Sequence, residues 1–197
     1  MNRKRLIITC TLFGSLLVNS LSELGVSHAT SKRGTPLPET MITAVESVGE
    51  TTLPRTATVQ KQVIKFLGKT ISYQNAGKGN GQAVINRNPN SLASTWGGKA
   101  IQSGTDNSNT HFIGHNPGAF NSLISLKNGV SIVITDSKGA AKTYVVNAIY
   151  KVDDYAKGIT NGVNYWSRIT GTSGGERVTF QTCLTSKINL IVEAKAK

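Results

Sequence analysis

From Gln60 onward, turn residues divide the chain into short apolar runs, and no run has the length and period of a long helix. The segment 62–74 alternates and is rich in Val, Ile, Phe and Tyr, and within 127–155 the sequences NG and DSKG separate three β-branched runs. Runs of this kind between turns are typical of β-strands. Their recurrence predicts an all-β fold, either a barrel or a sandwich.

The individual elements follow from the same local signals. We expect a short strand over 81–88 and one helical turn within 90–98. A strand over 109–116 should stop at the turn sequence NPG, and 165–171 should form a short helix or a turn. The last two strands are expected over the segments 174–183 and 187–194.

The N-terminus has the features of a secretory signal peptide. A basic stretch, residues 3–5, precedes an apolar run over 6–18, and Ser27 and Ala29 supply small residues for cleavage after position 29. The apolar run is short for a membrane span. We therefore predict three parts: a signal peptide (1–29), a flexible linker (30–58) rich in Thr, Ser, Pro and Gly, and a β-domain (59–197) that is secreted and associates with the cell envelope.

Charge narrows the class of partner. The chain has 22 basic and 10 acidic residues, and removal of the leader takes away three basic and one acidic, which leaves 19 − 9 = +10. For a secreted protein this charge favours an anionic cell wall or envelope, and not nucleic acid, as the partner. The lysines are scattered along the sequence, so the charge alone does not exclude a simple role in solubility.

Cys183 would be the sole cysteine of the mature chain, because removal of the leader takes away Cys10. A lone cysteine in a secreted protein indicates an intermolecular bridge, a buried inert thiol or a reactive group. His111 and His115 are four residues apart in an expected strand, about 13 Å, too far to chelate one metal. We expect no metal and no cofactor.

His115 follows Gly114 and precedes the NPG turn, a position from which an imidazole can face a cleft. An imidazole beside a thiol raises its thiolate fraction and makes it a nucleophile. The pair His115 and Cys183 therefore suits a cysteine acyl-transfer enzyme. A histidine satisfied by a backbone hydrogen bond is the alternative for either histidine.

Three segments, taken together, resemble the sortases, the cell-wall transpeptidases of Gram-positive bacteria. They are Gly114-His115 at a strand end, a hairpin from Leu126 to Gly139, and TFQTC from Thr179 to Cys183. The resemblance covers about residues 64–194. It implies an eight-stranded sortase-like β-barrel with short helices or turns, acting as a monomer on a sorting-signal peptide.

The resemblance also implies roles for individual residues. Cys183 would attack a Thr–Gly type of peptide bond and form a thioacyl enzyme, and His115 would act as general acid and later as base. Thr182 would give a hydroxyl or backbone donor to the oxyanion. Asn189 stands where the family has an arginine, and the cations that might replace that arginine are Lys187 and Arg168.

Two other interpretations stay open. A wall cross-linking L,D-transpeptidase also has a histidine before its cysteine, although the sequence FQTC lacks that family's motif. A non-catalytic module could keep the barrel and bind the cell wall or a protein partner. The absence of the arginine and the basic charge favour this second alternative over the first.

Overall fold

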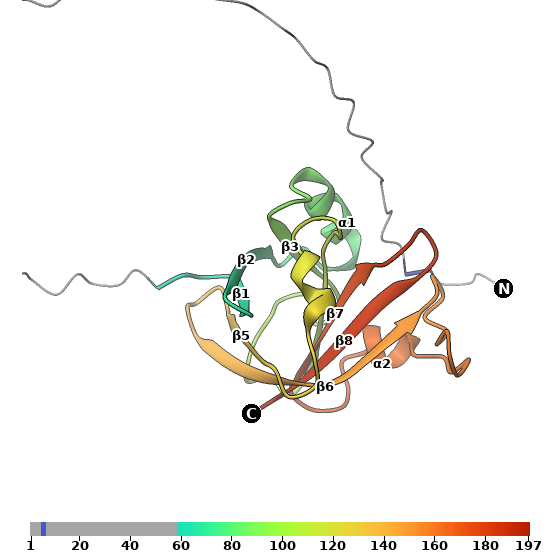
Figure 1. Ribbon diagram of the computed structural model, residues 1–197. Helices are drawn as coiled ribbons and strands as arrows, with labels where there is room; N and C mark the ends of the chain where they lie inside the picture. Colours follow the sequence, from blue (N-terminus) through green and yellow to red (C-terminus); the bar gives the residue numbers. More distant parts are fainter. Residues whose placement is uncertain (1–4, 7–58) are drawn as a thin grey trace, which may run out of the picture. The chain divides into compact units, whose positions relative to one another are not determined.

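The short apolar runs form the eight strands of a closed barrel in the computed structural model, which describes residues 5–6 and 59–197. The strands follow one another around the barrel in the order β1-β2-β3-β4-β7-β8-β6-β5 (Figure 1). Their bounds are β1 Val63–Phe66, β2 Lys69–Gln74, β3 Leu92–Gly98, β4 Asn109–Ile113, β5 Ser131–Thr135, β6 Ala141–Val152, β7 Arg177–Cys183 and β8 Asn189–Ala196. The prediction of an eight-stranded β-barrel is confirmed.

Two of the eight neighbouring pairs are parallel, β2 with β3 and β4 with β7. A parallel pair needs a crossover connection, and the one between β2 and β3 contains helix α1, Gly77–Arg87. The connection from β6 to β7 contains the short helix α2, Trp166–Thr170, within the segment expected as a short helix or turn. A 3₁₀ turn, η1, spans Asn121–Ser125.

The barrel interior holds the larger apolar cluster, to which every strand contributes at least one residue. Phe112 and Phe180 stack at its centre with ring centroids 5.5 Å apart, and Phe120 meets Phe180 edge-on at 6.0 Å. A second cluster contains Ile191, Cys183 and Ile169 of α2. The residues of β7 thus alternate between the interior and an outer face that α2 covers.

Two sequence predictions were wrong, and both concern the layer around α1. The segment 81–88 lies mostly in α1 and is not a strand, and 90–98 contains β3 and not a helical turn. In α1 the buried residues are Gly77, Gly81, Val84 and Ile85, the spacing of one helical face. Because the helix covers the outer side of β3, most of that strand is buried on both faces and shows no alternation.

The predicted signal peptide and linker lie outside the described residues, with the exception of Arg5 and Leu6. Within the part of the chain that is described, no helix combines the length and the apolar character needed to cross a membrane.

The approach of α1 to β3 leads to a test of stability. A Cβ on Gly81 would lie 2.6 Å from the carbonyl oxygen of Thr95, whereas a Cβ on Gly79 of the same helix would meet nothing within 4 Å. We expect Gly81→Ala to lower the free energy of unfolding by roughly 1–3 kcal/mol, because the helix must move away from the strand. Gly79→Ala should raise it by about 0.5–1 kcal/mol, since only the helix propensity changes. Urea unfolding followed by tryptophan fluorescence measures both, and equal effects would contradict the close approach.

Candidate functional site

The parallel pairing of β4 with β7 brings the ends of these two strands together. Ile113 is in register with Gln181, and the contact continues beyond the strands. The Thr182 hydroxyl donates to the Gly114 carbonyl at 2.8 Å, and the Asn116 side-chain amide donates to the Cys183 carbonyl at 2.9 Å. His115 stands between these two contacts, so the register aligns it with Cys183.

Gly114 lets the chain reach this position. A Cβ there would lie 2.7 Å from the ring of Phe120, which fills the barrel interior below. The glycine that precedes His115 in the sequence is therefore required by the packing of an aromatic ring under the backbone.

His115 is held by a residue that the sequence analysis missed. Its Nε2 lies 2.8 Å from Oδ1 of Asn86, which also accepts a hydrogen bond from Nε2 of Gln82 at 2.9 Å. Because Oδ1 accepts, Nε2 of His115 carries the proton, and Nδ1 is left with its lone pair. Burial lowers the pKa of His115 below its ordinary value, so the imidazole is neutral at pH 7. An imidazole in this state can accept a proton.

No sequence signal pointed to Asn86. The residue belongs to a segment that we expected to be a strand, where Gln82 and Asn86 would have lain about 13 Å apart. In a helix, residues four apart are neighbours on one face. The side chains of Gln82 and Asn86 make that contact in α1.

Cys183 ends β7 and is 2% exposed. It is disulfide-bonded in this structure, so the reactive thiol suggested by the sequence is not present in this state. A nucleophile at this position requires reduction of that bond. Removal of the predicted leader would also remove Cys10, the other cysteine of the sequence.

Asn189 lies directly opposite Cys183 on the neighbouring strand, and both atoms of its amide are engaged. Its Oδ1 accepts a hydrogen bond from Gln181 at 3.1 Å, and its Nδ2 donates to Asp154 at 3.2 Å. An arginine at this position would have supplied a positive charge beside the cysteine. Asn189 offers a neutral amide that already has two partners.

The other predicted site residues are placed differently. Arg168 forms a two-pronged ion pair with Glu193, four residues along β8 from Asn189, with both contacts at 2.7 Å. Lys187 is exposed in the turn between β7 and β8. The Thr182 hydroxyl is committed to the Gly114 carbonyl, and the residue is paired with Leu190 of β8.

His111 is fully buried in β4, four residues before His115 in the sequence. It lies in register with Thr179 and not with Cys183. Its Nδ1 contacts the Thr179 hydroxyl at 2.9 Å and its Nε2 contacts Oε1 of Gln181 at 3.1 Å. Burial lowers its pKa to about 4. His111 therefore belongs to a buried polar chain that runs through Gln181 to Asn189.

Arg5 and Leu6 lie against the segment that follows β6. Leu6 is 2% exposed and belongs to the same apolar cluster as Cys183 and Val152. Its backbone N–H donates to the Asp154 carbonyl at 2.6 Å, and Arg5 Nε donates to the Tyr155 hydroxyl at 3.0 Å. The surface beside Cys183 thus accepts a branched aliphatic side chain together with its backbone N–H.

Comparisons with known proteins agree with the fold. The model of the sortase domain matches residues 60–197. The solved structure of Streptococcus pneumoniae sortase C is similar with a TM-score of 0.52 and 16% identity, over 71% of this chain and 69% of that one. Sortase C2 from pilus island 1 of group B Streptococcus has a TM-score of 0.50 and 19% identity, over 71% and 76%. No curated protein sequence matches the chain.

The burial of His111 predicts a loss of stability in acid. Its pKa is about 4 in the folded protein, against about 6.5 in an unfolded chain. Above pH 6.5 both states are neutral. Between pH 6.5 and pH 4, the imidazole of His111 is protonated in the unfolded state but not in the folded state. The free energy of unfolding therefore falls over this range, by on the order of 3 kcal/mol.

Urea unfolding between pH 7 and pH 4 measures this loss. In His111→Gln the side chain does not titrate, so the difference in stability between the variant and the wild type should change across that window. Parallel curves for the two proteins would show that His111 does not titrate in this way.

Proposed function

Because the chain belongs to the sortase family, we propose that it is a cysteine transpeptidase or peptidase that cleaves a sorting-signal peptide through a thioacyl intermediate at Cys183. The observation that carries the proposal is the alignment of His115 with Cys183 at the parallel ends of β4 and β7. The Asn86 contact on His115 adds to it, since a third group that orients the base is typical of a Cys–His pair.

The reaction begins with the reduced cysteine. Nδ1 of His115 takes the thiol proton, and the Cys183 sulfur attacks the carbonyl carbon of the scissile peptide bond. The bond to the leaving nitrogen breaks as the imidazolium returns its proton to that amine, and a thioester remains. An incoming amine then gives its proton to His115 and displaces the sulfur. Water in place of the amine gives hydrolysis.

The oxyanion of the tetrahedral intermediate has to be stabilised mainly by neutral donors. The amide of Asn189 lies opposite Cys183 but is bonded to Asp154 and Gln181. Charge-assisted hydrogen bonds are roughly twice as strong as neutral ones. We therefore expect slower acylation than in a sortase that has the arginine.

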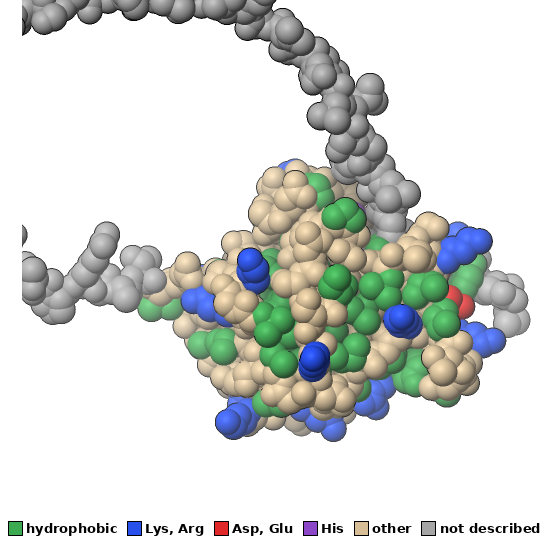
Figure 2. All heavy atoms as spheres, viewed as in Figure 1, with side chains coloured by type: hydrophobic (Ala, Val, Ile, Leu, Met, Phe, Trp, Pro, Cys, Tyr) green, Lys and Arg blue, Asp and Glu red, His purple; other side chains and the backbone are tan. Residues whose placement is uncertain are grey.

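The surroundings of Leu6 suggest how a peptide binds. An extended chain can place one branched aliphatic side chain in the cluster with Cys183 and Val152 and donate its N–H to Asp154. The basic surface favours an anionic wall or envelope as the site of action of a secreted, monomeric protein. Figure 2 shows Lys and Arg side chains spread over one face, with no single basic patch.

A second function has support from two features of the site. The disulfide-bonded state of Cys183 and the neutral Asn189 in place of an arginine both suit a module that uses the barrel to bind the wall or a protein partner without catalysis. Acylation of Cys183 by a peptide is expected of the enzyme and not of the binding module.

The test is to reduce the protein, incubate it with a library of sorting-signal peptides and search by mass spectrometry for a thioester at Cys183. We expect a mass increase on Cys183 that hydroxylamine removes. Cys183→Ala should show none, and His115→Ala should show little. If the reduced wild-type protein forms no adduct with any peptide and still binds cell walls, the binding module is the correct function.

The role of Asn86 can be tested separately from the fold. Asn86→Ala removes the acceptor that orients His115, and we expect kcat/KM on an accepted peptide to fall at least about tenfold. Asn86→Asp restores an acceptor and adds a charge that favours the imidazolium, so it should recover part of the activity and raise the pKa of His115 in the pH–rate profile. Gln82→Ala, which removes a hydrogen bond to Asn86 and leaves the contact of Asn86 with His115, is the control and should change the rate least. An unchanged pH–rate profile in Asn86→Asp would show that Asn86 does not act on His115.

A further inference from the structure

A cavity of about 400 Å³ lies on the outer face of β7 and β8, at the end of the strands away from the cysteine. Arg168, Arg177, Glu193 and Lys195 are among the residues that line it. Arg177 begins β7 and Cys183 ends it, a separation of roughly 20 Å along the strand. The cavity is therefore distinct from the proposed catalytic site.

The charges around the cavity do not balance. Three cationic side chains face one carboxylate, which leaves 3 − 1 = +2. Arg168 takes both oxygens of Glu193 at 2.7 Å. Arg177 stands directly opposite Lys195 across the strand pair, an arrangement of like charges that is destabilising without a counterion.

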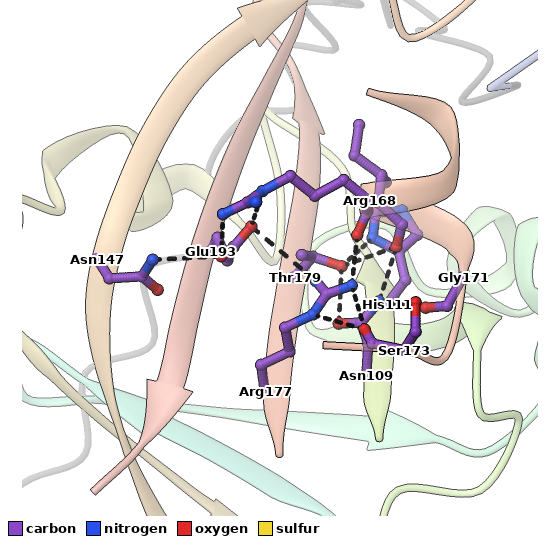
Figure 3. A network of polar contacts seen from close by, with 10 residues as sticks. Asn109, His111, Asn147, Arg168, Gly171, Ser173, Arg177, Thr179 and Glu193 are labelled. Atoms are coloured by element: carbon purple, nitrogen blue, oxygen red, sulfur yellow. Dashed lines mark hydrogen bonds and ion pairs between the residues drawn. The ribbon is translucent and has the colours of Figure 1, made fainter. Parts of the chain in front are cut away.

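Arg177 itself has an unused donor. Its Nε bonds the Ser173 carbonyl at 3.2 Å, and its Nη2 bonds the carbonyls of Arg168 and Ser173 at 2.7 and 3.0 Å (Figure 3). Within the described residues its Nη1 is buried without a hydrogen-bond acceptor, and the oxygen of Glu193 is 3.9 Å away. A buried charged donor without an acceptor is costly.

The backbone is shaped to keep the guanidinium in this position. Gly174 has a φ of +100°, and a Cβ there would lie 3.1 Å from Nε of Arg177. Two carbonyl groups hold the other two nitrogens, so the guanidinium points in a fixed direction while Nη1 has no hydrogen-bond acceptor among the described residues. Burial also lowers the pKa of Arg177, and Glu193 opposes this shift.

We propose that this cavity binds a phosphoryl group as a dianion. Nη1 of Arg177 and the ammonium of Lys195 donate to its oxygens, and its two negative charges match the excess of two positive charges. A single carboxylate would leave one cation uncompensated. The cavity is independent of the chemistry at Cys183. The proposal therefore stands whether or not the protein is an enzyme.

The experiment uses the full chain labelled with ¹⁵N, at low ionic strength, with inorganic phosphate and glycerol phosphate as separate probes. Titration calorimetry gives the affinity, and the Arg177 Nε–Hε resonance reports occupation of the cavity. We expect saturable binding that shifts this resonance. Binding of both probes indicates that the group is carried on a larger molecule, and binding of phosphate alone indicates the free ion.

Lys195→Glu is the main variant, because Lys195 is exposed and the change reduces the charge of the cavity from +2 to 0. It should weaken binding at least about tenfold, the effect of losing one charge-assisted contact. Lys65→Glu makes the same change of charge at the exposed residue of β1 and should leave the affinity nearly unchanged. Arg177→Lys keeps the positive charge and removes Nη1. Circular dichroism checks that this variant is folded.

Three results would overturn the proposal. Equal weakening by Lys65→Glu would mean that phosphate responds to the net charge of the whole protein. Saturation without a shift of the Arg177 resonance would place the ion elsewhere. Acetate binding as tightly as phosphate would show that the cavity does not select a dianion.

Discussion

The site depends on one backbone arrangement, the parallel pairing of β4 with β7. In an antiparallel pair the two strands would end at opposite edges of the sheet, and His115 and Cys183 would be a strand length apart. Parallel pairing places the carboxyl ends of both strands at one edge of the sheet. The residues that follow β4 are therefore next to the end of β7. Gly114, with the Phe120 ring beneath it, lets β4 extend one residue further towards Cys183.

The outer face of β7 and β8 holds a continuous buried polar chain. It leads from Thr179 through His111 and Gln181 to Asn189, and then to Asp154. Each member has a partner, which is the condition under which a buried polar group is tolerated. The chain fixes Asn189 and the segment after β6, and that segment is the one that touches Leu6. The surface that contacts Leu6 thus rests on hydrogen bonds below it as well as on apolar packing.

The barrel was predictable because its strands carry strong local signals. The β-branched runs and the NG and DSKG turns between 127 and 155 correspond to β5 and β6, and the segment before Cys183 corresponds to β7. The layer over β3 was not predictable in this way. Four glycines or asparagines in 77–81 weaken both helix and strand signals, and only contact with β3 explains why Gly81 sits in a helix. Asn86 was missed for the same reason, because its role depends on that helix.

The contacts of Arg168 and Arg177 explain why neither arginine lies beside Cys183. On β8, Asn189 and Glu193 share the outer face, and Arg168 and Arg177 gather around Glu193 at the far end. A buried carboxylate such as Glu193 is stable only with cationic partners, so neither arginine is available for a role near the cysteine. Asp154 at the other end is partnered by the Asn189 amide. An arginine at position 189 would therefore meet an acceptor that already exists. Asp154 and Gln181 thus form polar surroundings opposite Cys183 that hold the neutral Asn189 amide.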